Sequence, residues 1–109
     1  MIIVTIKRDK QKSVTGFRVE GHANFAEAGR DIVCAGVSAV TVGSVNAVEE
    51  LTGIVMDSRM KNGFLSADLP LASPAEAKAQ AMLLLSALVV MLRTIEQSYG
   101  QYIQIIDSD

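Results

Sequence analysis

Cysteine, histidine and tryptophan are scarce or missing in this chain: its 109 residues include one Cys, one His and no Trp. A single Cys cannot form an internal disulfide, so we expect a reducing compartment and a free thiol. Only three Phe and two Tyr are present although hydrophobic residues make up 50% of the chain, so the core must be mainly aliphatic. The length predicts one domain over 1–109.

An excess of positive charge is also missing, because ten Lys and Arg face twelve Asp and Glu and the formal net charge is −2. A free-standing nucleic-acid binder normally carries a basic face, so we expect no direct nucleic-acid contact. The first residues, MIIVTIKRDK, lack the basic start, long apolar region and cleavage site of a signal peptide. The most apolar run, at 81–92, is too short to cross a bilayer. We therefore expect a cytoplasmic protein without a membrane partner.

Strands are expected where β-branched residues gather or alternate with polar ones, and helices where apolar residues recur every three to four positions. Asp31 is a good N-cap for the first helix, and Gly53 is a good stop after it. Asn62 and Gly63 form a strong turn signal between two strand-like runs. The expected elements are, in chain order, strands at 2–8 and 14–22, a helix at 32–51, strands at 53–60 and 64–70, a helix at 73–100 and a strand at 102–107.

The second helix has the clearest end signals. Ser73 is expected to cap it, with Glu76 completing a capping box. Pro74 suits the first helical position, and Gly100 ends the helix. Its middle, 81–92, is apolar on every side, which predicts burial by the sheet and makes this helix a suspect for contact with a second subunit.

The order of elements, ββαββαβ, predicts an α+β fold. Two helices and about five strands form a two-layer sandwich when the apolar face of a mixed or antiparallel sheet packs against both helices. No internal linker, low-complexity segment or convincing repeat interrupts the chain.

The lone Cys and the lone His lie close together in sequence, in the stretch EGHANFAEAGRDIVCAGVS. If Asp31 is the N-cap, Cys34 lies in the first helical turn, where unpaired N–H groups and the helix dipole favour an anion such as a thiolate. His22 ends the second strand, and the loop between them is long enough to bring the imidazole to the thiol. A Cys and a His in hydrogen-bond reach are the minimum for acyl-transfer catalysis.

Other roles remain open for the same residues. A lone Cys in an aliphatic helix is usually a core residue. A zinc site built from Cys34, His22 and Asp31 matches no standard spacing, so we expect no metal and no cofactor. As N-cap, Asp31 would occupy the Cys34 N–H, which would then not be free for an oxyanion. Ser38, one turn later, would position the substrate or the thiol, or bond back to the Cys34 carbonyl.

One motif is more specific than a Cys/His pair. Gly21-His22-Ala23, Gly29, the run DIVCA at 31–35 and VS at 37–38 resemble the signature of the ribosomal-processing cysteine protease family, Prp. The length and the order of elements are also similar, so the resemblance covers nearly the whole chain. Many members carry Ala-Ala after the Cys, whereas this chain has Ala35-Gly36, a small change that adds backbone freedom.

The resemblance implies a cytoplasmic bacterial endopeptidase that works as a homodimer. Such an enzyme removes the N-terminal extension of large-subunit ribosomal protein twenty-seven and cuts after a pair of Phe residues. By the same resemblance Cys34 is the nucleophile and His22 the general base and acid. The remaining expected site residues are Asp31 and Ser38 as supporting groups, Gly21, Ala23, Phe25 and Gly29 in a substrate loop, and Phe25, Ala26 and Val37 along an apolar groove.

Two alternatives belong to other classes of protein. A non-enzymatic ribosome-associated module would use the same loop to bind the same N-terminal segment without cutting it. A structural α+β dimer would hold Cys34 as an inert packing residue. We also expect that the imidazole and thiol lie apart when no substrate is bound, because the loop is free to open.

Overall fold

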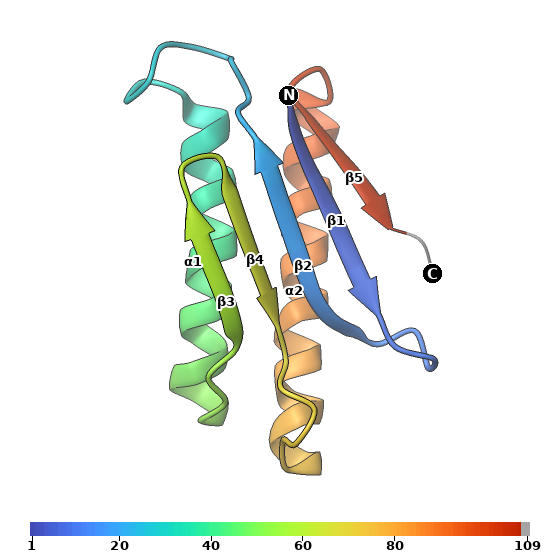
Figure 1. The fold of residues 1–109 in the computed structure, drawn as a ribbon. Helices are drawn as coiled ribbons and strands as arrows, with labels where there is room; N and C mark the ends of the chain where they lie inside the picture. Colours follow the sequence, from blue (N-terminus) through green and yellow to red (C-terminus); the bar gives the residue numbers. More distant parts are fainter. Residues whose placement is uncertain (108–109) are drawn as a thin grey trace.

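The computed structural model describes residues 1–107 and confirms the predicted order of strands and helices (Figure 1). The predicted ends of β1, β2, α1, α2 and β5 lie within two residues of the observed ones. The described elements are β1 (Ile2–Arg8), β2 (Val14–Gly21), α1 (Ile32–Thr52), β3 (Asp57–Lys61), β4 (Phe64–Asp68), α2 (Ala75–Tyr99) and β5 (Ile103–Asp107).

The five strands form one mixed sheet in the order β3-β4-β2-β1-β5. β1 and β5 are parallel, and the other neighbours are antiparallel. Antiparallel neighbours in sequence need only short turns, whereas the chain reaches β5 from β4 across the sheet through α2. Both helices cover the same face of the sheet (Figure 1), which confirms the α+β sandwich.

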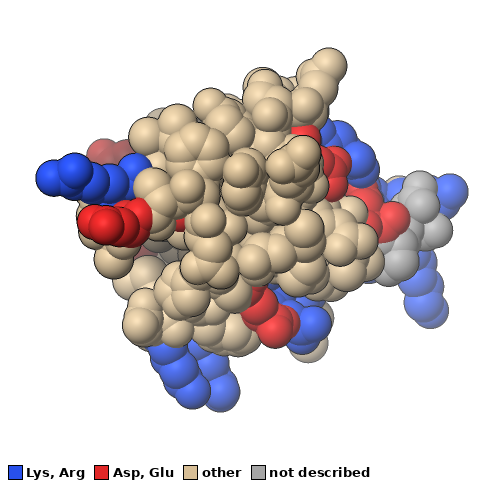
Figure 2. Space-filling view, turned by 90° about the horizontal axis from the view of Figure 1, so that it is seen from above, with Lys and Arg blue, Asp and Glu red and all other residues tan. Residues whose placement is uncertain are grey.

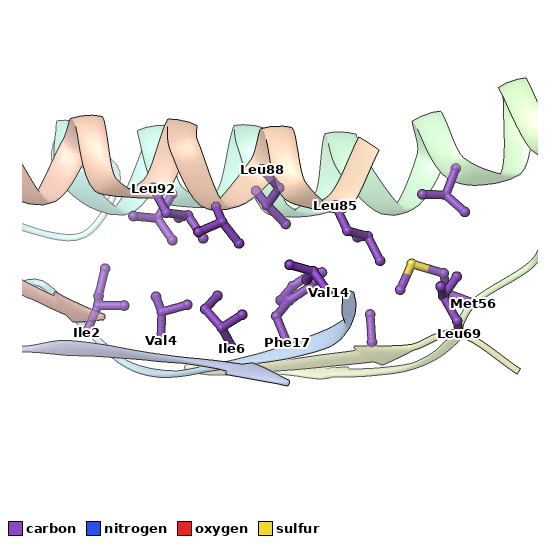
Figure 3. Packing of buried hydrophobic residues seen from close by; sticks show 14 of the residues in the cluster. Ile2, Val4, Ile6, Val14, Phe17, Met56, Leu69, Leu85, Leu88 and Leu92 are labelled. Carbon is purple, nitrogen blue, oxygen red and sulfur yellow. The ribbon is translucent and has the colours of Figure 1, made fainter. Parts of the chain in front are cut away.

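An aliphatic core fills the space between the sheet and the helices (Figure 3). Alternate side chains of β1, Ile2, Val4 and Ile6, point toward the helices because successive residues of a strand face opposite sides. Leu85 and Leu88 of α2 meet them from the other layer and are almost completely buried. The helical period brings such residues to one side of α2, so the sheet covers one stripe of the helix.

The second hairpin begins later than predicted. Residues 53–56 are not part of a strand, and β3 starts at Asp57. Gly53 ends α1 in the left-handed conformation with φ 78°, as predicted, and the chain then buries Ile54 and Met56 in the core. These apolar side chains resemble a strand in sequence, but they anchor the connection. β4 ends at Asp68, two residues before its predicted end.

The predicted capping box of the second helix is wrong. The helix starts at Ala75, and Pro74 is the N-cap without a side-chain hydrogen bond. The backbone carbonyl of Pro74 accepts the N–H of Lys78, so the helix starts one residue later than a Ser73 cap requires. The Ser73 hydroxyl instead donates to the Pro70 carbonyl at 3.0 Å and closes the preceding turn.

The outer side of α2 is apolar without being covered. Leu83, Val90 and Met91 are 72%, 64% and 47% exposed. By length and composition alone both helices are apolar enough to cross a membrane. Core helices share this property, and here the two helices pack against each other while α2 also packs on β2 and β5.

Candidate functional site

Asp31 caps α1 as predicted and sets where the helix begins. Its Oδ1 accepts the N–H groups of Val33 and Cys34, both at 3.0 Å. Cys34 therefore lies in the first turn, where N–H groups would otherwise lack partners. The same contact shows that the Cys34 N–H is occupied by the cap and is not free for an oxyanion.

The second oxygen of Asp31 holds the loop that precedes the helix. Its Oδ2 accepts the N–H of Phe25 at 2.9 Å and that of Ala26 at 3.4 Å. The hydrogen bond from the Cys34 N–H, against partial desolvation and with help from the other three N–H groups, holds the pKa of Asp31 below its ordinary value of 3.8. One carboxylate thus joins the 22–31 loop to the start of α1.

The thiol of Cys34 has a hydrogen-bond donor in the same loop. Cys34 Sγ accepts the N–H of Ala23 at 3.3 Å. Ala23 is buried, and Cys34 is half-buried against the core. A sulfur that accepts an N–H is held in a defined position relative to that donor. The beginning of the loop therefore lies directly over the thiol.

His22 directly follows β2, the central strand, and lies at the end of the sheet where the thiol is found. Gly21 has φ 90°, and a side chain there would collide with the Met1 carbonyl, so the turn out of the strand requires glycine. The imidazole is exposed and rests on Gly63 of the β3–β4 turn. Within residues 1–107 no hydrogen bond joins the imidazole to Cys34 Sγ.

Two hollows meet at the thiol. The first lies beside α1 and the β3–β4 hairpin, has a volume of about 310 Å³ and is lined by both polar and aliphatic side chains, the latter including Val19, Val37 and Leu65. The second, about 680 Å³, lies between the loop and the first turn of α1. Both are in the usual size range for ligand pockets, about 300–1,000 Å³. The residues that line both hollows are His22, Cys34, Ser38 and Asn62.

Asn62 is the member of this set that the sequence did not reveal as a site residue. The Asn-Gly pair signals a turn, which the structure confirms between Lys61 and Phe64. Nothing in the local sequence places that turn beside residues 22 and 34. Figure 1 shows why they meet, since the 22–31 loop and the β3–β4 turn lie at the same end of the molecule, near the start of α1.

The structure brings most of the other expected residues to the hollows. Val37 lines the first hollow, and Ala26 and Gly29 line the second. The ring of Phe25 lies outside both and instead makes edge contacts with Tyr99 and Tyr102, at centroid distances of 5.8 and 5.1 Å. Phe25 therefore anchors its part of the loop to the end of α2.

Two alternatives were a hydrogen bond from Ser38 to the Cys34 carbonyl and a metal site at Cys34, His22 and Asp31. No hydrogen bond from the Ser38 hydroxyl to the Cys34 carbonyl occurs in the described part of the chain. Across residues 1–107, no three His, Cys, Asp or Glu side chains gather closely enough to hold a metal ion. Both oxygens of Asp31 already accept backbone N–H groups.

The end of the molecule that carries the site is mostly uncharged. In the end-on view the middle of the surface consists of residues without charge, and the Lys, Arg, Asp and Glu side chains lie around the edges (Figure 2).

A thiol at a helix N-terminus that lines the same two hollows as the one imidazole of the chain fits a cysteine protease. The comparison with protein families agrees with this class and makes it more specific. The family described as cysteine protease Prp matches residues 1–104, and the chain belongs to this family.

Curated relatives match nearly the whole chain. A protein of Bacillus subtilis (strain 168), named ribosomal processing cysteine protease Prp, is 41% identical over 107 residues, with 96% of each chain covered. A protein of the same name from Staphylococcus aureus (strain Mu50) is 37% identical over 105 residues, covering 96% of this chain and 97% of that one.

Two solved structures share the fold over nearly the whole chain. The essential ribosomal processing protease Prp from S. aureus, in complex with a covalently linked product peptide, superposes with a TM-score of 0.86 at 36% identity. That match covers 99% of this chain and 100% of the other. The S. aureus protease in complex with a substrate peptide gives a TM-score of 0.82 at 35% identity.

Proposed function

We propose that this cysteine protease removes the N-terminal extension of large-subunit ribosomal protein twenty-seven, cutting after a pair of Phe residues. The observation that carries the proposal is that Cys34, in the first turn of α1, shares both hollows with His22. The relatives' name, ribosomal processing protease, supports a ribosomal protein as substrate. The Phe pair comes from the family resemblance.

In the proposed reaction His22 takes the proton of Cys34, and Sγ adds to the carbonyl carbon of the second Phe. The carbon–nitrogen bond breaks as His22 gives its proton to the leaving amine, which leaves a thioester on Cys34. Water, with His22 as base, then releases the acid and restores the thiol. The relative with a covalently linked product peptide supports a covalent route.

The hydrogen bond from the Ala23 N–H to Sγ contributes to this chemistry by stabilising the thiolate before attack. The Cys34 N–H, held by Asp31 Oδ1, is not available to the oxyanion in this arrangement. We therefore assign Asp31 the supporting role of holding the loop and the helix together. Ser38, which lines both hollows, is assigned a supporting role next to the thiol.

The first hollow is the proposed binding site for a Phe ring. Apolar side chains contribute to its lining, with Val19, Val37 and Leu65 among them. A buried aromatic ring gains free energy roughly in proportion to the apolar area it removes from water. The second hollow, open and lined by the loop, would hold the chain on the other side of the cut bond.

The proposal is tested by following the intact mass of the extended ribosomal protein with time. We expect a single cut after the Phe pair with the wild type, and none with Cys34→Ala. A substrate with both Phe replaced by Ala serves as the specificity control and should remain uncut. If Cys34→Ala and His22→Ala each cleave at the wild-type rate, the dyad is refuted.

Co-elution and thiol alkylation separate the two alternatives from the protease. Substrate that stays uncut but co-elutes with the protein would indicate a ribosome-associated binding module. For the inert structural Cys, alkylation of native Cys34 would be slow and become fast only on unfolding. The half-buried thiol at the meeting point of two hollows favours a reactive role over packing.

We also propose that the protein is cytoplasmic and forms a homodimer. The free thiol fits a reducing compartment. The exposed apolar side chains of α2, Leu83, Val90 and Met91, are of the kind that a second subunit would cover. Determination of the mass in solution tests the second part of this proposal.

A further inference from the structure

The turn between β3 and β4 reaches the candidate site from a distant part of the sequence. Lys61 and Phe64 are paired, so Asn62 and Gly63 form a two-residue hairpin turn, with φ 74° at Gly63. The Gly63 carbonyl also accepts the N–H of Gly21 at 2.9 Å. This bond continues the β2–β4 ladder by one step and fixes the turn directly beside the residue that precedes His22.

The imidazole of His22 occupies the space where a side chain at position 63 would stand. A Cβ on Gly63 would lie 2.7 Å from His22 Nε2, closer than real Cβ atoms approach such a neighbour, and 3.3 Å from Cε1, which is a tight contact. No other neighbour of that position is as close. The ring is the end of a side chain with freely rotating bonds, so an added Cβ would displace the imidazole and leave the backbone in place.

We propose that Gly63 is a positioning residue for His22: its bare backbone is the surface against which the imidazole is placed for its work on Cys34. The inference rests on the proposed function, in which His22 is the base and acid. A Cβ at this position would move the ring from the place it occupies beside the two hollows. A misplacement of about 1 Å costs as much as about 100-fold in rate.

The positive φ at Gly63 is a second reason for glycine at this position, besides the space that the imidazole occupies. A substitution can test the two reasons separately. Asparagine accepts left-handed φ more readily than most residues do. Gly63→Asn therefore keeps the turn and still carries the Cβ that meets the imidazole. Gly53→Asn is the matched control, because Gly53 has φ 78° and nothing lies within 4 Å of its Cβ position, far from the site.

We expect Gly63→Asn to lower kcat for cleavage of the extended ribosomal protein by about 10- to 100-fold, since proton transfer by His22 is impaired. Gly63 also lines the first hollow, so KM is measured separately from kcat. Gly53→Asn should remain within about twofold of the wild type. The single His gives one Hε1 signal in proton NMR, and that signal should move in Gly63→Asn only. Wild-type kcat in Gly63→Asn would overturn the inference.

A double-mutant cycle shows whether Gly63 acts through His22. In the His22→Ala background, Gly63→Asn should produce no further loss of cleavage or of the Cys34 alkylation rate. An equal loss in both backgrounds would assign Gly63 a role independent of the imidazole and refute the inference. Cleavage by His22→Ala at the wild-type rate would instead refute the dyad itself, so the two failures are distinguishable.

Discussion

Replacing Asp31 with asparagine would separate two tasks that one carboxylate performs. Oδ1 caps α1 through the N–H groups of Val33 and Cys34, whereas Oδ2 holds the loop through the N–H groups of Phe25 and Ala26. Asparagine is as good an N-cap as aspartate. Its amide NH₂, however, is a donor and would face two backbone donors in place of Oδ2.

We expect Asp31→Asn to keep the helix and to release the loop. The melting temperature should change by no more than a few degrees, since the cap persists. Cleavage should fall by about 10- to 100-fold, because the loop that carries Ala23 and the neighbouring His22 is no longer held within the tolerance that catalysis needs. Asp31→Ala, which removes both oxygens, should lose activity to at least the same extent and also lower the melting temperature.

The assay combines cleavage kinetics with hydrogen exchange of single amides. In Asp31→Asn the Phe25 and Ala26 amides should exchange faster, and those of Val33 and Cys34 should stay protected. Wild-type cleavage by Asp31→Asn with an exchanging loop would refute the idea that the loop must be anchored.

The pH dependence of this anchor follows from the lowered pKa of Asp31. A carboxyl whose pKa is lower in the folded state contributes its full stabilisation above the unfolded value, and this is lost as pH falls through the folded value. Loop protection should therefore be constant near neutral pH and disappear only below about pH 3.8, the ordinary value. Loss of protection between pH 7 and 5 would contradict this assignment.

Three further predictions concern stability and assembly. Leu85→Ala, at a fully buried position of α2, should lower the free energy of unfolding in urea by about 2–5 kcal/mol, whereas Leu71→Ala, 96% exposed, should change it by less than about 0.5 kcal/mol. Asp107→Asn should lower the free energy of unfolding by about 1–3 kcal/mol at pH 7, because the hydrogen bonds and charge of Arg8, and then those of Arg93, hold the pKa of Asp107 below 3.8 against partial desolvation. The difference from the wild type should vanish as pH falls below 3.8, and a difference that persists there would contradict the ion-pair explanation. Val90→Glu, on the exposed side of α2, should convert a homodimer into monomers in sedimentation equilibrium, and an unchanged dimer mass would place the interface elsewhere.

Local signals predicted the fold well where each signal has one structural meaning. Asn62-Gly63 predicted a hairpin turn, and Asp31 and Gly53 predicted both ends of α1, because capping and left-handed φ depend on a few neighbouring residues. The predictions were wrong where two structures share a pattern. Ile54 and Met56 resemble a strand, but they are core anchors before β3.

Ser73 shows the same limit at a finer scale. Its spacing to Glu76 fits a capping box, yet its hydroxyl bonds to the Pro70 carbonyl. A serine hydroxyl satisfies a turn as readily as a helix end, and the sequence contains no signal that decides between the two.

The candidate site was predictable only within one continuous stretch. Cys34, His22 and Asp31 lie within thirteen residues of each other, so a strand end, a loop and a helix start were enough to bring them together. The two oxygens of Asp31, the N–H of Ala23 on the thiol and the position of Phe25 against two Tyr rings depend on how that loop folds.

The sequence by itself determined the class of fold, the position of Cys34 in the first turn of α1 and, through a specific motif, the family of cysteine proteases. These properties arise from hydrophobic periodicity, capping chemistry and residues close together in the chain. Only the tertiary structure decided that Asn62 and Gly63 stand beside His22, twenty-eight or more residues after Cys34. The physical reason is that the β2–β4 pairing is a long-range contact, set by burial of the whole sheet against two helices and not by the residues that happen to meet.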